Sequence, residues 1–492
     1  MEKEQRKTLI SAALMIAAIV LLIATKHLNI LLAILMIGLV ICFHEFGHFV
    51  IARVNGVTVK EFSIGMGPRL LSRKIRGTRW SIKLFPFGGS CLMLGEDEPI
   101  MIDPEAQAEN ASPENEEVPK DEAAKELAEE GVSFKSKGVW QRISIVFAGP
   151  FFNFILAFLL ACIILGSIGY DPAYVTSVSE ELAKETGLAK DDLILEYNDH
   201  TIRIGRDLAL YENLDGVPKH VKLVYERDGK KYETEYDTFY RSRYLCGITY
   251  SISANGTRIP MKLDEVSGPA AEVGLKPGDI ITAVNGVSVE TPEDFQAYTG
   301  EHPFDGSPIT FNIRRGDNDS LLFKLTPIQS EEQLLGFSYN INYREKTGVL
   351  GVIRYGFTEV RYWMKATVKS LGYLLQGKAS RKDVGGAVRV VSEVSNVVDT
   401  SYKTDGAFYA FLNLINWAIL LSANLGVMNL LPIPALDGGR LLFLLIEAVR
   451  GKPVNPKVEG YVTLVGFVLL MLLMVFILYN DISNVFGMLI GI

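Results

Sequence analysis

Hydrophobic positions along the chain gather in long runs that are separated by polar stretches. The runs lie at about 8–25, 28–52, 143–169 and 461–479, and a slightly more polar run covers about 407–430. Each run approaches the roughly 20 residues that a helix needs to cross the hydrocarbon core of a bilayer. The pattern predicts a multi-pass α-helical membrane protein with about five spans. The first run lacks a small-residue cleavage site, so we expect a retained span rather than a signal peptide.

Charge is distributed unevenly along the 492 residues. Residues 96–130 hold 14 acidic side chains against two lysines, a local balance of −12, whereas the whole chain carries −8. The rest of the chain is therefore positive by 4, the difference between −8 and −12. A segment rich in Glu, Pro and Ala with few large apolar residues is typical of a flexible insert. We expect such an acidic insert over residues 96–135, on the cytoplasmic side.

The basic residues predict the orientation in the membrane, because short loops rich in Lys and Arg stay in the cytoplasm. Lys3, Arg6 and Lys7 precede the first run, a basic stretch at 53–83 follows the second, and another at 440–457 follows the fourth. All three basic stretches fall on the cytoplasmic side if each apolar run crosses the membrane once. The same number of crossings places residues 171–405 outside the cell.

The predicted outer region contains a repeat. The stretch "KETGLAKDDLILEYNDHTI" at 184–202 matches "AEVGLKPGDIITAVNGVSV" at 271–289 with an offset of 87 residues, and the same offset pairs Arg227 with Arg314. A constant offset predicts two copies of one small domain. The second copy resembles a PDZ domain, so we expect PDZ-like α/β domains at 171–248 and 249–345. Two roles stay open for them: peptide binding by strand addition to a sheet edge, and a plug that limits access by size.

The second apolar run carries "HEFGH", residues 44–48, which has the form H-E-x-x-H. Residues four apart share one helix face, so His44 and His48 can reach one metal ion. A third ligand completes a catalytic zinc site and leaves a position for water, whose proton Glu45 can accept. Ionisable side chains inside a span are costly and usually functional, so we favour this interpretation over a buried polar cluster.

The stretch "NLLPIPALDGGR" at 429–440 supplies the candidate for the third ligand. It ends the run at 407–430 on the same side as His48, and its two prolines break the helix. Asp437 is its only acidic residue, and a carboxylate completes the two-histidine set of hydrolytic zinc enzymes. The alternative is that Asp437 caps a following helix.

Together these residues resemble the site-2 proteases, the intramembrane zinc metalloproteases of peptidase family M50. "HEFGH" and "NLLPIPALDG" fit both motifs of that family, HExxH and NxxPxPxLDG, and "AGPFFNF" at 148–154 resembles its second core span. The resemblance is strongest to the bacterial type with tandem PDZ domains. It implies that His44, His48 and Asp437 bind Zn²⁺, that Glu45 is the general base, and that Asn429 holds substrate or the oxyanion.

The resemblance also implies substrate, place and further architecture. We expect an endopeptidase of the bacterial plasma membrane that cleaves single-span membrane proteins within the lipid bilayer, such as an anti-sigma factor or remnant signal peptides, and no nucleic-acid partner. Residues 61–92 would form a β-hairpin that re-enters the membrane. The remaining expected segments are an extra N-terminal span at 1–27, a first core span with the hairpin at 28–95, a second core span at 136–170, an amphipathic helix and connector at 346–405, and the C-terminal core spans at 406–492.

Other classes of function fit the residues less well. A catalytically silent, PDZ-bearing membrane scaffold is the alternative, but the intact set of His44, Glu45, His48 and Asp437 argues against it. A transporter with a metal site would be expected to show an inverted repeat. Residues 350–376 predict an amphipathic helix, which would either lie on the outer leaflet or cap the repeated domains.

Overall fold

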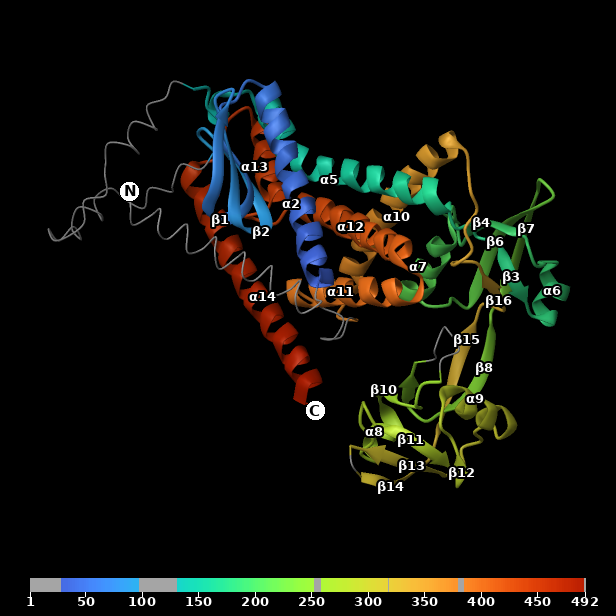
Figure 1. The fold of residues 1–492 in the computed structure, drawn as a ribbon. Coiled ribbons are helices and arrows are strands. Elements are labelled where there is room, and N and C mark those ends of the chain that lie inside the picture. The colour runs from blue at the N-terminus through green and yellow to red at the C-terminus, as the bar shows by residue number, and fades with distance from the viewer. Residues whose placement is uncertain (1–27, 97–130, 252–257, 317, 379–384, 491–492) are drawn as a thin grey trace. The chain divides into compact units, whose positions relative to one another are not determined.

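The structure is a computed structural model that describes residues 28–96, 131–251, 258–316, 318–378 and 385–490 (Figure 1). The chain divides into two compact units. The helical unit runs to Tyr170 and resumes at Glu345, and the β-rich unit comprises Asp171–Arg344. The span expected at 8–25, and residues 97–130 of the expected acidic insert, lie outside the described residues.

Among the described residues, four helices are long and apolar enough to cross a membrane. They are α2 (Leu28–Val54), α5 (Val139–Ile168), α12 (Ala407–Leu430) and α14 (Pro456–Ile490), the last over Pro456–Asp481. These helices coincide with four of the five apolar runs in the sequence. The expected class, an α-helical membrane protein, is therefore confirmed.

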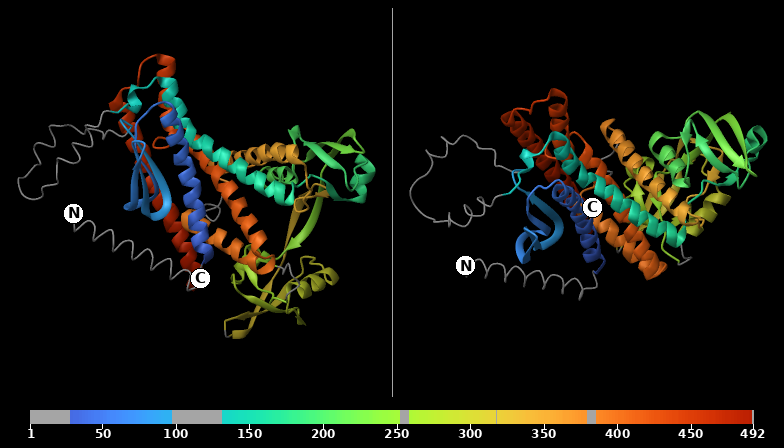
Figure 2. Two further views of the ribbon diagram at one scale, coloured as in Figure 1. Left: turned by 45° about the horizontal axis from the view of Figure 1, so that its top comes forward. Right: turned by 90° about the horizontal axis from the view of Figure 1, so that it is seen from above.

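Helices α2 and α12 both pack against α5 (Figures 1 and 2). Small side chains lie at these contacts: Ala33, Ala157, Ala161 and Ala423 have no exposed surface. Small residues let two backbones approach closely, which is how helices commonly associate in a membrane. Helix α14 instead exposes apolar side chains between Val458 and Tyr479, among them Leu469 at 61%, as expected of a helix that faces lipid.

In the described part of the helical unit there are also the α-helices α10 (Val349–Leu375), α11 (Ala387–Thr404) and α13 (Asp437–Arg450). The amphipathic helix expected at 350–376 is α10, and it packs against α5 and α12. The Tyr355 ring stacks on Tyr170 with centroids 3.8 Å apart, and Phe357 lies 4.5 Å from Phe158. Helix α10 thus packs partly on its own chain, while apolar side chains such as Phe357 (62%) and Val368 (58%) stay exposed.

A β-hairpin, β1 (Val59–Ile75) and β2 (Thr78–Met93), packs beside α2 (Figure 1). The first part of β1 is paired on both sides: Phe62 lies opposite Cys91 on one side and opposite Trp80 on the other. Residues 89–93 therefore form an edge of this small sheet, next to α2. The hairpin also exposes apolar side chains such as Leu71 at 67% and Met66 at 52%.

The β-rich unit contains two copies of one α/β fold. The first repeat domain consists of β3 (Val175–Val178), α6 (Glu180–Thr186), β4 (Leu193–Tyr197), β5 (His200–Thr201), α7 (Gly205–Asp215), β6 (His220–Arg227) and β7 (Lys230–Asp237). The second consists of β9 (Ile248–Tyr250), β10 (Leu263–Val266), α8 (Gly268–Glu272), β11 (Ile280–Val284), β12 (Val287–Ser288), α9 (Pro292–Glu301), β13 (Ile309–Arg315) and β14 (Asn318–Leu325). Their sheets have the equivalent orders β5-β4-β6-β7 and β12-β11-β13-β14.

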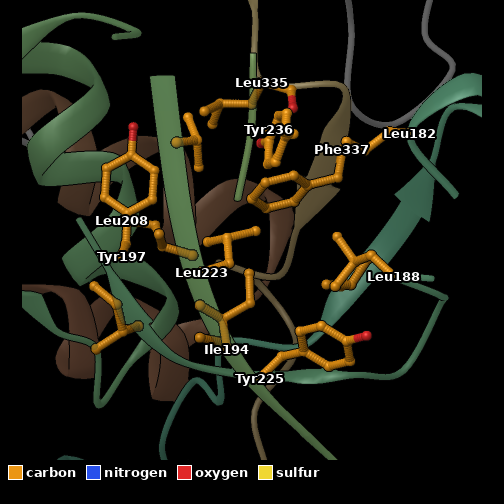
Figure 3. Close-up of a cluster of buried hydrophobic side chains, with 14 of the residues drawn as sticks. Leu182, Leu188, Ile194, Tyr197, Leu208, Leu223, Tyr225, Tyr236, Leu335 and Phe337 are labelled. Atoms are coloured by element: carbon orange, nitrogen blue, oxygen red, sulfur yellow. The ribbon is translucent and has the colours of Figure 1, made fainter. Parts of the chain in front are cut away.

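The second repeat domain is nested inside the first, whereas the sequence predicts two consecutive domains with a boundary at 248/249. Strand β8 (Phe239–Leu245) leads out of the first domain, and β15 (Ile328–Leu334) pairs with it antiparallel on the way back. The next strand, β16 (Phe337–Tyr339), pairs with β3 of the first domain. Leu335 and Phe337 lie in the first domain's apolar core with Leu223 (Figure 3). The expected boundary therefore places these two residues in the wrong domain.

Nesting makes the two domains circular permutants of each other. Strand β16 pairs antiparallel with β3 in the first domain, and β9 pairs antiparallel with β10 in the second, so β16 and β9 are equivalent strands. The Ser179 amide donates to the Gly336 carbonyl at 2.8 Å, just as the Ser267 amide donates to Gly247 at 2.7 Å. The equivalent strand thus comes last in the first domain and first in the second.

One ion pair recurs in both domains and corrects the repeat offset. Asp192 is 1% exposed and binds Arg227 through two hydrogen bonds of 2.6 Å, and Asp279, also 1% exposed, binds Arg315 in the same way. The sequence offset of 87 pairs Arg227 with Arg314 instead. That match is wrong by one residue, because the segment from the start of α9 to Arg315 holds 24 residues and the equivalent segment from the start of α7 to Arg227 holds 23.

Candidate metal centre

The two histidines of HEFGH lie on one face of α2, directly against α5. His44 is 6% exposed and His48 8% exposed, and their rings meet edge to face with centroids 4.9 Å apart. Two glycines allow this close approach. A Cβ on Gly47 would come within 2.4 Å of the Ala148 carbonyl, and one on Gly149 would come within 2.3 Å of Nε2 of His48. The helices can therefore meet at the histidines only with glycine at both positions.

Asp437 reaches the histidines from the first residue of α13. The chain between α12 and α13 turns sharply, and Ala435 adopts a left-handed conformation with φ 76°. Gly438 and Gly439 follow, and a Cβ on either would lie within 2.5 Å of a carbonyl oxygen of that turn. The Pro-rich turn and the two glycines thus press the start of α13 against the end of α12, which places the Asp437 carboxylate at the histidines.

Three ligand atoms converge on one point. Nε2 of His44 lies 3.1 Å from Oδ2 of Asp437, Nε2 of His48 lies 3.4 Å from the same oxygen, and the two nitrogens are 3.2 Å apart. Ligands held about 2.0–2.1 Å from a tetrahedral zinc ion lie about 3.3 Å from one another. Oδ2 is also buried without a hydrogen-bond partner of acceptable geometry. The triangle and its donor set therefore fit zinc.

Helix α5 orients the His48 ring. Its Nδ1 lies 2.9 Å from the main-chain carbonyl of Ile145. Since a carbonyl can only accept, Nδ1 of His48 carries the proton and Nε2 presents its lone pair to the metal position.

Glu45 is held between the histidine helix and the hairpin. Its Oε2 accepts a hydrogen bond of 3.0 Å from the main-chain N–H of Cys91 on the edge segment of β2. Gly89 lies two residues earlier, and a Cβ there would touch Cγ of Glu45 at 3.4 Å. The carboxylate of Glu45 therefore lies between the two histidines of α2 and the sheet edge.

Asn429 is half-buried in the last turn of α12, eight residues before Asp437 along the chain. Within the described part of the chain, its side chain forms no hydrogen bond and is not part of the ligand triangle. The structure thus brings together His44, His48 and Asp437, places Glu45 beside them, and leaves the Asn429 amide available.

Sequence reasoning missed the contribution of α5. Gly149 and Asn153 lie against the histidine rings, but in the sequence they are only small or polar residues within an apolar run. A proline followed by an asparagine inside a predicted span is the signal that could have indicated them, because both are unusual in the middle of an apolar helix.

A two-histidine, one-carboxylate centre with an adjacent glutamate, enclosed by apolar helices, is the site of a hydrolytic metalloenzyme of the membrane. Residues 32–473 match the model of peptidase family M50, and the chain belongs to that family.

Curated relatives cover nearly the whole chain. The zinc metalloprotease RasP of Geobacillus kaustophilus is 30% identical over 467 residues, which cover 93% of this chain and 98% of the relative. The regulator of sigma-W protease RasP of Bacillus subtilis is 28% identical, covering 92% of this chain and 98% of the relative. The family and these relatives confirm the expected class, a membrane zinc metalloendopeptidase.

One solved structure resembles a short part of the chain. It is the PDZ domain of HtrA3 bound to a phage-derived ligand, 25% identical, covering 19% of this chain and 93% of that domain with a TM-score of 0.16.

Proposed function

We propose that His44, His48 and Asp437 hold the zinc ion of this membrane endopeptidase, and that the enzyme cleaves single-span membrane proteins within the bilayer. The observation that carries the proposal is the triangle of ligand atoms, with edges of 3.1, 3.2 and 3.4 Å, in which both histidines lie on a helix that is long enough to span a membrane. Bound zinc would polarise the scissile carbonyl and lower the pKa of a water.

The chain's own residues then move the proton. Glu45 takes a proton from the water as its oxygen adds to the scissile carbonyl, and gives that proton to the departing amide nitrogen. The Cys91 N–H orients the Glu45 carboxylate for both transfers. The Asn429 side chain supplies a hydrogen-bond donor for the oxygen that becomes negative during the addition.

The edge of the hairpin suits an unwound substrate. A helical substrate hides its amides, so the segment to be cut must become extended before attack. Residues 89–93 form an edge of the small sheet beside Glu45, and an extended peptide can add to such an edge through main-chain hydrogen bonds. The exposed apolar side chains of the hairpin support a position within the membrane.

Charge distribution supports the orientation expected from the sequence. The metal centre would lie toward the cytoplasmic side of the bacterial plasma membrane, and the β-rich unit outside. There the two domains, PDZ-like in our interpretation, would bind a peptide or exclude bulky substrates. The name of one relative, regulator of sigma-W protease, supports an anti-sigma factor as one substrate, and remnant signal peptides are the other expected group.

The proposal is tested with purified protein in liposomes that contain a single-span substrate. Wild type should bind about one zinc per chain and cleave. Asp437→Leu should lose both zinc and cleavage, because the third ligand is gone. A control, Asp399→Leu, changes a half-buried acid on α11 that pairs with Lys403 and should keep both. Full zinc binding by Asp437→Leu would overturn the ligand set, and zinc binding without cleavage of any span would favour the silent scaffold.

A further inference from the structure

Asn153 on α5 faces the outer side of the first metal ligand. It has no exposed surface, and its Nδ2 lies 3.1 Å from Nδ1 of His44. Its Oδ1 is buried and has no hydrogen-bond partner. The Ser422 hydroxyl of α12 donates to the Asn153 main-chain carbonyl at 2.8 Å, which fixes this turn of α5 against its neighbour. The amide is therefore held at the histidine by two packed helices.

If the amide nitrogen of Asn153 faces His44, the Nδ1 atoms of the two histidines have opposite hydrogen-bonding roles: Nδ1 of His44 accepts, whereas Nδ1 of His48 donates. An –NH₂ group can only donate, so Nδ1 of His44 would have to accept and the ring proton would sit on Nε2. A protonated Nε2 cannot bind a metal. His48 shows the compatible arrangement, since its Nδ1 donates to the Ile145 carbonyl and leaves the Nε2 lone pair free.

A half-turn of the Asn153 carboxamide removes the conflict. The oxygen and nitrogen ends have nearly the same shape, so the turn moves no neighbour and brings Oδ1 to the place that faces Nδ1. We propose that Asn153 is a positioning residue whose Oδ1 accepts the Nδ1–H of His44, fixing the tautomer and ring orientation in which Nε2 binds zinc. This inference rests on the proposed ligand set.

This role predicts how much zinc affinity falls when the acceptor at position 153 is lost. Partners that accept the second N–H of a metal-binding histidine hold the ring in place and make it a better ligand, and their loss lowers metal affinity about 10–100-fold. The role also requires an acceptor at position 153. A carboxylate can replace the amide because it accepts, whereas an apolar side chain of the same shape cannot.

Zinc affinity of three full-length proteins in detergent tests this requirement, measured by competition with a chromophoric chelator. Asn153→Leu should bind zinc about 10–100-fold more weakly than wild type, and Asn153→Asp should stay within about threefold of wild type or bind more tightly. A packing role predicts the reverse order, because leucine fills the site and a buried carboxylate disrupts it. A donor role predicts that both variants bind weakly.

A matched control removes a different amide with the same chemistry. Asn424 lies on α12 and bonds to the Thr367 hydroxyl, away from both histidines, so Asn424→Leu should keep the zinc affinity of wild type. Cobalt substitution adds a second readout, because the visible spectrum of the tetrahedral ion should shift in Asn153→Leu and persist in Asn153→Asp. If Asn153→Leu does not fold, Asn153→Asp alone decides: an affinity reduced tenfold or more overturns the inference. Absence of zinc from wild type would instead overturn the ligand set.

Discussion

Gly149→Ala is the smallest change that should separate the histidines from their metal position. The added Cβ would lie 2.3 Å from Nε2 of His48 and 2.8 Å from Cε1 of His44, while ordinary contact begins at 3.4 Å. The His48 ring would have to withdraw by about 1.1 Å, the difference between 3.4 and 2.3 Å. The ring cannot simply turn away, since its Nδ1 is tied to the Ile145 carbonyl.

The size of the effect follows from that displacement. Functional groups must stay within about 0.5 Å of productive geometry, and a misplacement of 1 Å lowers rates by about 100-fold. We expect Gly149→Ala to lose about 10–100-fold in zinc affinity and about 100-fold in cleavage at saturating zinc. The assay measures zinc by chelator competition and cleavage of a single-span substrate in liposomes.

Gly166→Ala is the matched control. Gly166 lies in the same helix, and a Cβ there would meet nothing within 4 Å. Alanine favours a helix over glycine by up to about 1 kcal/mol, so neither variant should lose stability through its helix propensity. If Gly149→Ala matches Gly166→Ala in zinc affinity and in cleavage, the histidine rings do not lie against α5 and the geometry described here is wrong.

Two further substitutions test the surroundings of the centre and the repeat. Gly89→Ala should lower cleavage about tenfold with zinc content unchanged, because the added Cβ would lie only 3.0 Å from the Ser63 carbonyl and would shift the edge segment whose Cys91 N–H holds Glu45, without touching a ligand; lost zinc would contradict this. Arg315→Met should destabilise the second repeat domain by about 2–4 kcal/mol, measured by urea unfolding of the full chain, since it leaves the buried Asp279 carboxylate unpaired. Arg314→Met should lower the free energy of unfolding by less. An equal loss in the two variants would instead favour Arg314 as the residue equivalent to Arg227.

Much of the centre was predictable because its chemistry is local. His44 and His48 share a helix face through their spacing alone, and Asp437 stands out as the only acid in a Pro-rich stretch at the end of an apolar run. The contribution of α5 was not predictable in this way. Asn153 matters only because α5 packs against α2, and no spacing in the sequence reports that contact.

The repeat shows the same limit at the level of domains. The matched turns around Gly187 and Gly274 reveal two copies, since turn chemistry is local. Strand β16 is only Phe337–Tyr339, and its partner β3 lies far away in sequence. Such a short strand carries little pattern of its own, so its return to the first domain depends on the core that it fills. The one-residue difference between Arg314 and Arg315 was hidden because both positions are arginine, and only the contact with Asp279 distinguishes them.

The most direct test of the central claim is the position of the cut, determined by intact-mass measurement of a single-span substrate reconstituted with the enzyme. Wild type should cut within the apolar segment. Glu45→Gln should leave the substrate whole while retaining about one zinc per chain, because the glutamine cannot accept the proton of the water. A cut outside the span, or a cut that persists in Glu45→Gln, would contradict the account.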